Sequence, residues 1–297
     1  MSGTLRVTQR SIADRALAGL QANLDRLGTI QEQLSSGRAI NKPSDSPIGT
    51  VSALQVRGSI EQNAQWSRNA NDGLGWLGTI DSSLTSVRTM SNRVRDLTLQ
   101  GLNAGASSPT AREALATEVD QIRNAMIGVA NTTYMDRPVF GGTTTGTAAY
   151  DSAGTYLGDA NPTARTVGAN DQVRIESTGP EVFGTGPTNL FQVLATISAD
   201  LRSNNQTGLS NDLSTLDTAS ANLMNKATDI GARYQRVDQM RQAADDRQMA
   251  LKNTLSGIED VDLPKTMMAL QMQQVAYQSA LGATAKAIQP SLMDFLR

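Results

Sequence analysis

The chain of 297 residues contains no cysteine and no histidine. Without cysteine there is no disulfide, no thiolate metal site and no cysteine nucleophile. Without histidine the chain lacks the commonest general base, the commonest metal ligand and every catalytic triad that needs an imidazole. No pair of carboxylates stands out as a catalytic acid and base. The sequence therefore predicts a protein that is not an enzyme, with no catalytic residue, cofactor or metal site.

Aromatic residues and net charge are also low, because Phe, Trp and Tyr make up 4% of the chain and the formal net charge is −2. Scarce aromatics favour long helical assemblies, in which Leu, Ile, Val and Ala form narrow seams. The lack of a basic field argues against nucleic acid or an anionic membrane as a partner. No apolar run follows Arg10 as in a secretory signal, and none approaches the roughly 18 residues of a transmembrane helix.

A heptad pattern runs through residues 209–258. Mostly apolar residues recur there at alternating steps of four and three, from Leu209 to Ile258, and no proline interrupts them. This period keeps one seam of a helix facing a partner helix. The pattern predicts one helix of roughly 50 residues, about 75 Å long. Such a helix suits a rod better than a compact domain.

Each end of the chain carries a shorter stripe of the same kind, which we predict to be an assembly seam. Its members are Leu17, Leu20, Leu24, Leu27 and Leu34 near the N-terminus and Leu270, Tyr277, Leu281, Ile288, Leu292 and Phe295 near the C-terminus. The alternative is core packing in one stable bundle. Narrow stripes at both chain ends favour a seam for polymerisation or for a partner.

Short breaks set these stripes apart from the rest of the chain. We predict domain joints at Gly37, Pro43, Ser44, Asp45 and Pro47, and at Gly257 and Asp262. Glycine can end a helix, proline cannot continue one, and Ser or Asp can cap the next. An ordinary helix connector is an equal alternative for the first joint. The acidic residues around Asp262 lack the roughly 12-residue loop of an EF-hand, so capping is the preferred interpretation.

The middle of the chain has a different composition. Glycine, proline and threonine are frequent in residues 139–187, and Val173 to Glu176 alternate apolar and charged side chains, as in a half-buried strand. Ser108 and Pro109 are placed to start one further helix, and Asn189 is placed to cap another. We predict three domains: a terminal helical assembly domain (1–42 with 258–297), a helical rod (43–138 with 188–257) and a small β-rich insertion (139–187).

Residues 31–47 read QEQLSSGRAINKPSDSP. This segment resembles the N-terminal block of flagellin-related proteins, and its last six residues are more similar to the hook-associated protein 3 family of hook–filament junction proteins than to flagellins. Residues 93–100, 129–143 and 260–296 resemble further blocks of that family. Ala39 and Ser46 depart from it, since Arg and Asp are usual at these positions.

The resemblance covers roughly residues 1–142 and 188–297. It implies a mainly α fold, a long antiparallel helical rod like the flagellin D0/D1 coiled coil and bundle, with the β-rich insertion. It further implies an extracellular structural component of the bacterial flagellum, exported by the flagellar type III apparatus without a cleaved signal peptide. Such proteins form the junction ring between the hook and the filament and are needed for filament assembly and motility. The implied partners are hook-associated protein 1, flagellin, further copies of the chain and an export chaperone; the alternative is a flagellin filament subunit.

Overall fold

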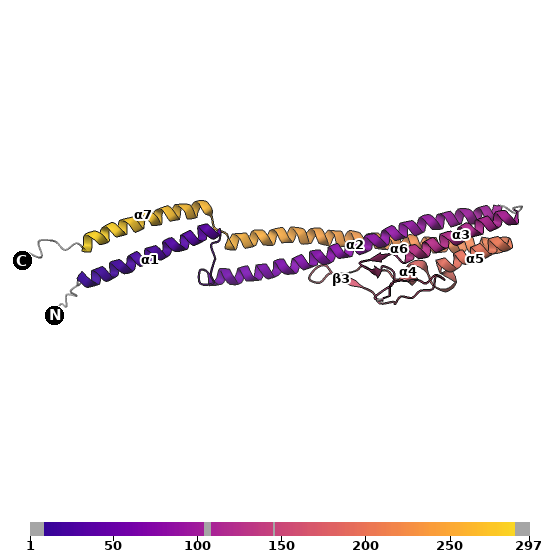
Figure 1. Ribbon diagram of the computed structural model, residues 1–297, viewed down its shortest axis with the longest axis horizontal. Helices are drawn as coiled ribbons and strands as arrows, with labels where there is room; N and C mark the ends of the chain where they lie inside the picture. The colour runs from indigo at the N-terminus through magenta and orange to yellow at the C-terminus, as the bar shows by residue number, and fades with distance from the viewer. Residues whose placement is uncertain (1–8, 104–107, 145, 289–297) are drawn as a thin grey trace, which may run out of the picture. The chain divides into compact units, whose positions relative to one another are not determined.

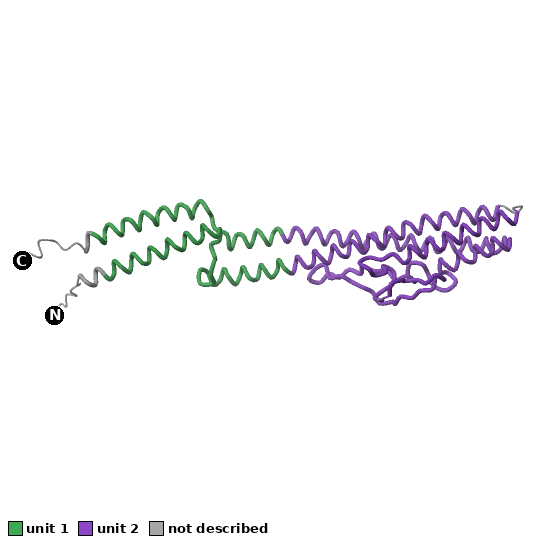
Figure 2. Tube along the Cα trace, viewed as in Figure 1, with its two compact units in different colours: residues 1–61, 249–297 green, residues 62–248 purple. Residues whose placement is uncertain are grey.

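The computed structural model describes residues 9–103, 108–144 and 146–288. The fold is mainly α, with long helices and two small antiparallel strand pairs. Contacts divide the chain into two compact units, which Figure 2 shows in two colours. Unit 1 comprises residues 1–61 and 249–297, and unit 2 comprises residues 62–248. The three predicted domains are a finer partition with other boundaries, which these contacts do not test.

The helices of the described chain include two of more than 50 residues (Figure 1). The helical elements are α1 (Gln9–Ser36), α2 (Pro47–Asn103), α3 (Pro109–Ala130), α4 (Gly179–Phe183), the 3-10 turn η1 (Gly186–Thr188), α5 (Leu190–Ser203), α6 (Gln206–Glu259) and α7 (Leu263–Ile288). The predicted helix over 209–258 is confirmed by α6. The sequence pattern did not reveal that one helix continues from Pro47 to Asn103.

The predicted helix start at Ser108 and Pro109 and the predicted cap at Asn189 are confirmed. The Ser108 side chain accepts a hydrogen bond from Ala111 N, and Asn189 Oδ1 accepts from Phe191 N and Gln192 N. Both side chains thereby satisfy amide groups that have no partner in the first helical turn.

Unit 2 is organised around the antiparallel helices α2 and α6. Asn63 Nδ2 donates to Ala244 O at 2.7 Å, and Arg95 Nε donates to Asp217 Oδ1 at 2.7 Å. The later residues of α2 therefore face the earlier residues of α6, as in an antiparallel pair. The core between the helices holds fully buried aliphatic side chains such as Leu77, Ile80 and Leu216. The polar contacts fix the register of this apolar seam.

The segment between α3 and α5 contains two pairs of short β-strands. Strand β1 (Thr133–Tyr134) pairs with β2 (Arg137–Pro138), and β3 (Ala164–Thr166) pairs with β4 (Gln172–Arg174). Three of the four phenylalanines, Phe140, Phe183 and Phe191, gather here around Tyr150, with the Tyr150 and Phe191 rings 4.9 Å apart. They belong to the same buried cluster as the helical core of unit 2. The few aromatic side chains of the protein thus hold the irregular segment onto the helices.

Candidate assembly interface

Helices α1 and α7 lie side by side in unit 1 and form an antiparallel hairpin (Figure 1). Gln273 Nε2 donates to Asn23 O at 3.2 Å and to Asn23 Oδ1 at 3.1 Å. Within the described part of the chain, no other side-chain hydrogen bond joins these two helices. The rest of the seam is apolar, and it half-buries the predicted residues Leu20, Leu27 and Leu34 of α1 and Leu270 and Tyr277 of α7.

Three other predicted seam residues do not lie between the helices. Leu17, Leu24 and Leu281 are exposed by 58%, 47% and 43%. Asn23 and Ile30 face α7 instead. The leucines at 20, 27 and 34 belong to two overlapping heptad stripes, and only one of the two stripes can face α7. The side chain of Ile288, and all of Leu292 and Phe295, lie outside the described residues.

The outer surface of α7 is also apolar. Met267, Met268, Met272 and Val275 are all more than half exposed, and no charged residue occurs from 266 to 285. Unit 1 contributes 12 of the 16 exposed large apolar side chains of the described chain, whereas the larger unit 2 contributes four. A helix that is apolar on opposite faces normally has neighbours on both. Unit 1 therefore exposes an apolar surface of the kind that marks interaction sites in proteins.

The two connectors of unit 1 pair with each other through their backbones. Ala39 N donates to Glu259 O at 2.6 Å, and Val261 N donates to Gly37 O at 3.0 Å. Next to this pairing, Arg57 Nη2 lies 2.7 Å from Glu259 Oε2, and the Glu259 side chain is only 8% exposed. The buried carboxylate has a cationic partner, without which its burial would be unfavourable.

The first joint uses a different cap from the predicted one. Gly37 has φ +72° directly after α1, a conformation that glycine adopts readily. Ser46, rather than Ser44 or Asp45, precedes α2, and its Oγ accepts from Gly49 N, with Pro47 as the first helical residue. Pro43 and Ser44 lie in the exposed turn before it.

Asp45 stabilises that turn. Its carboxylate accepts hydrogen bonds from the Lys42 and Asn41 amides, and these bonds lower the pKa of Asp45. Ser46 rather than Asp45 caps α2 because it stands directly before the first helical residue.

The second joint also differs in part. Gly257 does not end the long helix, since α6 continues to Glu259. From there on, backbone groups form hydrogen bonds with residues 37 and 39 instead of continuing the helix. Asp262 lies at the start of α7, as predicted, and its Oδ1 accepts from Lys265 N at 3.1 Å. The break therefore covers only residues 260–262.

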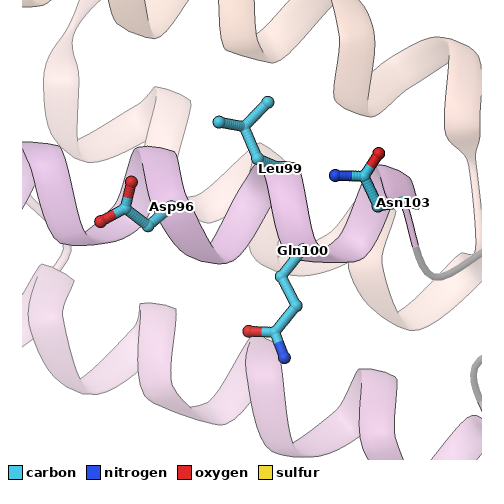
Figure 3. A pocket seen from close by; sticks show the side chains of 4 residues that line it. All are labelled: Asp96, Leu99, Gln100 and Asn103. Carbon is cyan, nitrogen blue, oxygen red and sulfur yellow. The ribbon is translucent and has the colours of Figure 1, made fainter.

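One hollow on the described surface of unit 2 offers little chemistry to a ligand. A hollow at the end of α2 is lined by Asp96, Leu99, Gln100 and Asn103, with Gln100 pointing away from Leu99 (Figure 3). All four side chains come from one helix and only one is charged. In the described ranges, no group of three or more Asp or Glu side chains could hold a metal ion. No described helix combines the length and apolarity needed to cross a membrane.

Comparisons with known proteins agree with this architecture. The model of the bacterial flagellin N-terminal helical region matches residues 7–145, and the model of the C-terminal helical region matches residues 213–296. Together they cover well over half of the chain, which belongs to the bacterial flagellin family. Within that family it is similar to flagellar hook-associated protein 3. The Escherichia coli K12 protein of that name is 25% identical over 298 residues, which are 91% of this chain and 92% of the relative.

A flagellin is similar to the same degree: that of Bacillus subtilis is 24% identical over 305 residues, covering 96% of this chain and 97% of the relative. Solved structures show the shared fold. A flagellar hook-associated protein from Vibrio parahaemolyticus aligns with a TM-score of 0.67 at 22% identity, over 73% of this chain and 100% of its own. FlgL from Bacillus cereus aligns with a TM-score of 0.61 at 20% identity, over 68% and 99%. The chain is accordingly a structural component of the bacterial flagellum.

Proposed function

We propose that the chain forms the junction ring between the hook, through hook-associated protein 1, and the flagellin filament. The observation that carries this proposal is the apolar outer face of α7, which remains open while the opposite face packs on α1. In a closed monomer that face would be polar. The resemblance of residues 42–47 to the hook-associated protein 3 family rather than to flagellins supports the junction position over a place within the filament.

The mechanism is packing. Full burial of a side chain such as Met272 or Val275 contributes about 1.5–3 kcal/mol. Several such contacts, made by neighbouring copies, hook-associated protein 1 and flagellin, can offset the entropy lost when subunits associate. The α1–α7 hairpin is the element that contacts the neighbouring subunits. The predicted seam residues Leu17, Leu24 and Leu281 are exposed on its two helices. Assembly then requires no chemical step.

The same face gives a reason for an export chaperone. A subunit that waits in the cell with α7 uncovered exposes an apolar surface on which chains associate prematurely. A chaperone that covers α7 until export through the flagellar type III apparatus, without a cleaved signal peptide, would prevent this. A pull-down of α7-deleted and full-length chains from the source bacterium tests the idea, since only the full-length chain should retain the chaperone.

Deletion of the gene in the source bacterium tests the junction role. Cells should keep their hooks and release flagellin into the medium, and expression of the chain from a plasmid should restore filaments. Normal filaments on the deletion strain contradict the proposal. Purified chain that polymerises alone into long filaments would favour a flagellin subunit instead.

A further inference from the structure

Three methionines gather on the open face of α7. Met267, Met268 and Met272 are exposed by 58%, 59% and 70%. At about 100° per residue they fall, with Val275, within an arc centred about 140° from the mean direction of the inward residues Leu270 and Tyr277, with Met267 at the edge nearest to them. The arc therefore faces away from α1, and its exposed apolar surface is largely made of thioethers.

Exposed thioethers are the side chains of this face that react with peroxide. The sulfur lone pair attacks one peroxide oxygen, so that an S–O bond forms and the O–O bond breaks. The departing hydroxide takes up the remaining proton and leaves as water. Methionine is oxidised by two electrons to its sulfoxide and hydrogen peroxide is reduced. The apolar side chain becomes a polar one with a strong hydrogen-bond acceptor.

We propose that Met267, Met268 and Met272 form an oxidation site at which hydrogen peroxide converts the free chain into a form that cannot assemble. This inference rests on the proposed function, because it requires the outer face of α7 to be covered by neighbours. The face carries no charge and its side chains offer mainly apolar contact. A sulfoxide buried there lacks a donor, and an unpaired buried acceptor is unfavourable.

The site also responds differently before and after assembly. In the free chain the three sulfurs meet solvent, and oxidation follows exposure. In an assembled ring the same sulfurs are covered and are protected. Peroxide therefore removes subunits that have not yet been incorporated and leaves finished flagella intact.

The chain contains its own controls. Met135 and Met224 belong to unit 2 rather than to the α1–α7 hairpin and are exposed by 73% and 55%, whereas Met126 is fully buried. Met135 and Met224 should be oxidised as readily as the α7 methionines but without effect on assembly. Met126 should remain reduced while the protein is folded.

The experiment uses full-length chain treated with hydrogen peroxide until about half of each exposed methionine is oxidised. The mixture is incubated with hooks purified from the deletion strain, and pelleted and free chains are compared by peptide mass spectrometry. Sulfoxide at the α7 positions should be depleted about tenfold from the pellet, as expected for one lost buried contact. Sulfoxide at Met135 and Met224 should be equal in both fractions.

Equal α7 sulfoxide in pellet and supernatant overturns the inference. Failure of untreated chain to pellet contradicts the proposed function instead, so the two failures are distinct. A variant with Met267→Leu, Met268→Leu and Met272→Leu provides a second measurement, in which its incorporation after peroxide is compared with its incorporation without peroxide. Peroxide should leave the incorporation of this variant unchanged, whereas a variant with Met135→Leu and Met224→Leu should lose incorporation like the parent chain.

Discussion

Two consecutive residues, neither of them glycine, adopt left-handed backbone angles at the tip of the β1–β2 hairpin. Met135 has φ +48° and Asp136 has φ +61°, and the flanking residues Tyr134 and Arg137 pair with each other. A two-residue hairpin turn of this kind needs positive φ at both positions, for which Asn followed by Gly is favoured. Methionine is poorly suited to this conformation, so the turn is locally strained.

Replacing this turn should therefore stabilise unit 2. Met135→Asn together with Asp136→Gly is expected to raise the free energy of unfolding by about 1 kcal/mol. Urea denaturation of the purified protein measures the change. Met224→Asn is the control, because Met224 is also more than half exposed but is helical. That control should lose a little stability, and a lower midpoint in the turn variant would show that its backbone is not strained.

A second single-residue effect is pH-dependent. Burial, followed by the negative charge of Asp200 and a hydrogen bond with it, raises the pKa of Asp212 to about 6. Asp212 is thus protonated in the folded chain at pH values where the unfolded chain has released the proton. Stability should fall as the pH rises from about 4 to 6, because the folded state then binds more protons than the unfolded state.

Asp212→Asn should remove this loss. The variant is expected to be more stable than the parent chain at pH 7.5, by on the order of 1 kcal/mol because solvent screens the half-buried carboxyl. The difference should disappear near pH 4. Urea denaturation at both pH values checks it, with Asp246→Asn, at an exposed position on the same helix, as the control. An equal gain at both pH values would rule out a proton as the cause.

At the scale of elements, the α1–α7 hairpin depends on one polar contact for its register. A shift by seven residues would bring Gln273 opposite Ile30 or Ala16 and remove its side-chain acceptor, Asn23 Oδ1. A single polar pair in an apolar seam typically selects register at some cost in stability. Asn23 and Gln273 therefore specify how the ends of the chain pair.

Cross-linking can test this role, because the chain has no cysteine of its own. Ala16 and Ala280 are half-buried and occupy opposing positions in the same register as Asn23 and Gln273. Ala16→Cys with Ala280→Cys should form a disulfide efficiently in the parent chain. Adding Asn23→Leu and Gln273→Leu should reduce its yield several-fold while the helices melt at a higher temperature. Unchanged yield would mean that the apolar side chains alone set the register.

Sequence patterns predicted the helices better than their faces. The unbroken heptads of α6, the helix start at Ser108 and the caps at Asn189 and Asp262 are local signals, and the structure contains them. Leu20, Leu27 and Leu34 belong to two stripes at once, and only the position of α7 decides between Asn23 and Leu24. The end of α6 could not be read from Gly257 because the backbone pairing that ends it involves residues more than 200 positions away. Such long-range contacts produce no periodic pattern in the sequence.

At the scale of the whole molecule, exposed and seam leucines should behave differently. Leu24→Asp or Leu281→Asp should block incorporation into flagella and leave the helices folded, because both side chains are exposed in the free chain. Leu27→Asp, at a half-buried seam position, should instead loosen the α1–α7 hairpin. Circular dichroism and incorporation into flagella of the deletion strain measure both effects. Global unfolding of the Leu24 or Leu281 variants would contradict a separate assembly surface.

The pairing of the two connectors has a consequence for how this family can diverge. Ala39 stands where arginine is usual, yet its contribution to the joint is an amide hydrogen that every amino acid except proline supplies. Arg38 and Asp260, which lie opposite each other there, are both exposed. The two hydrogen bonds between the connectors are therefore made by main-chain atoms alone. Substitution of Ala39 by any residue except proline should leave them in place, so the pairing tolerates change at this position, whereas Gly37, Ser46 and Glu259 contribute through their own backbone angle or side chain.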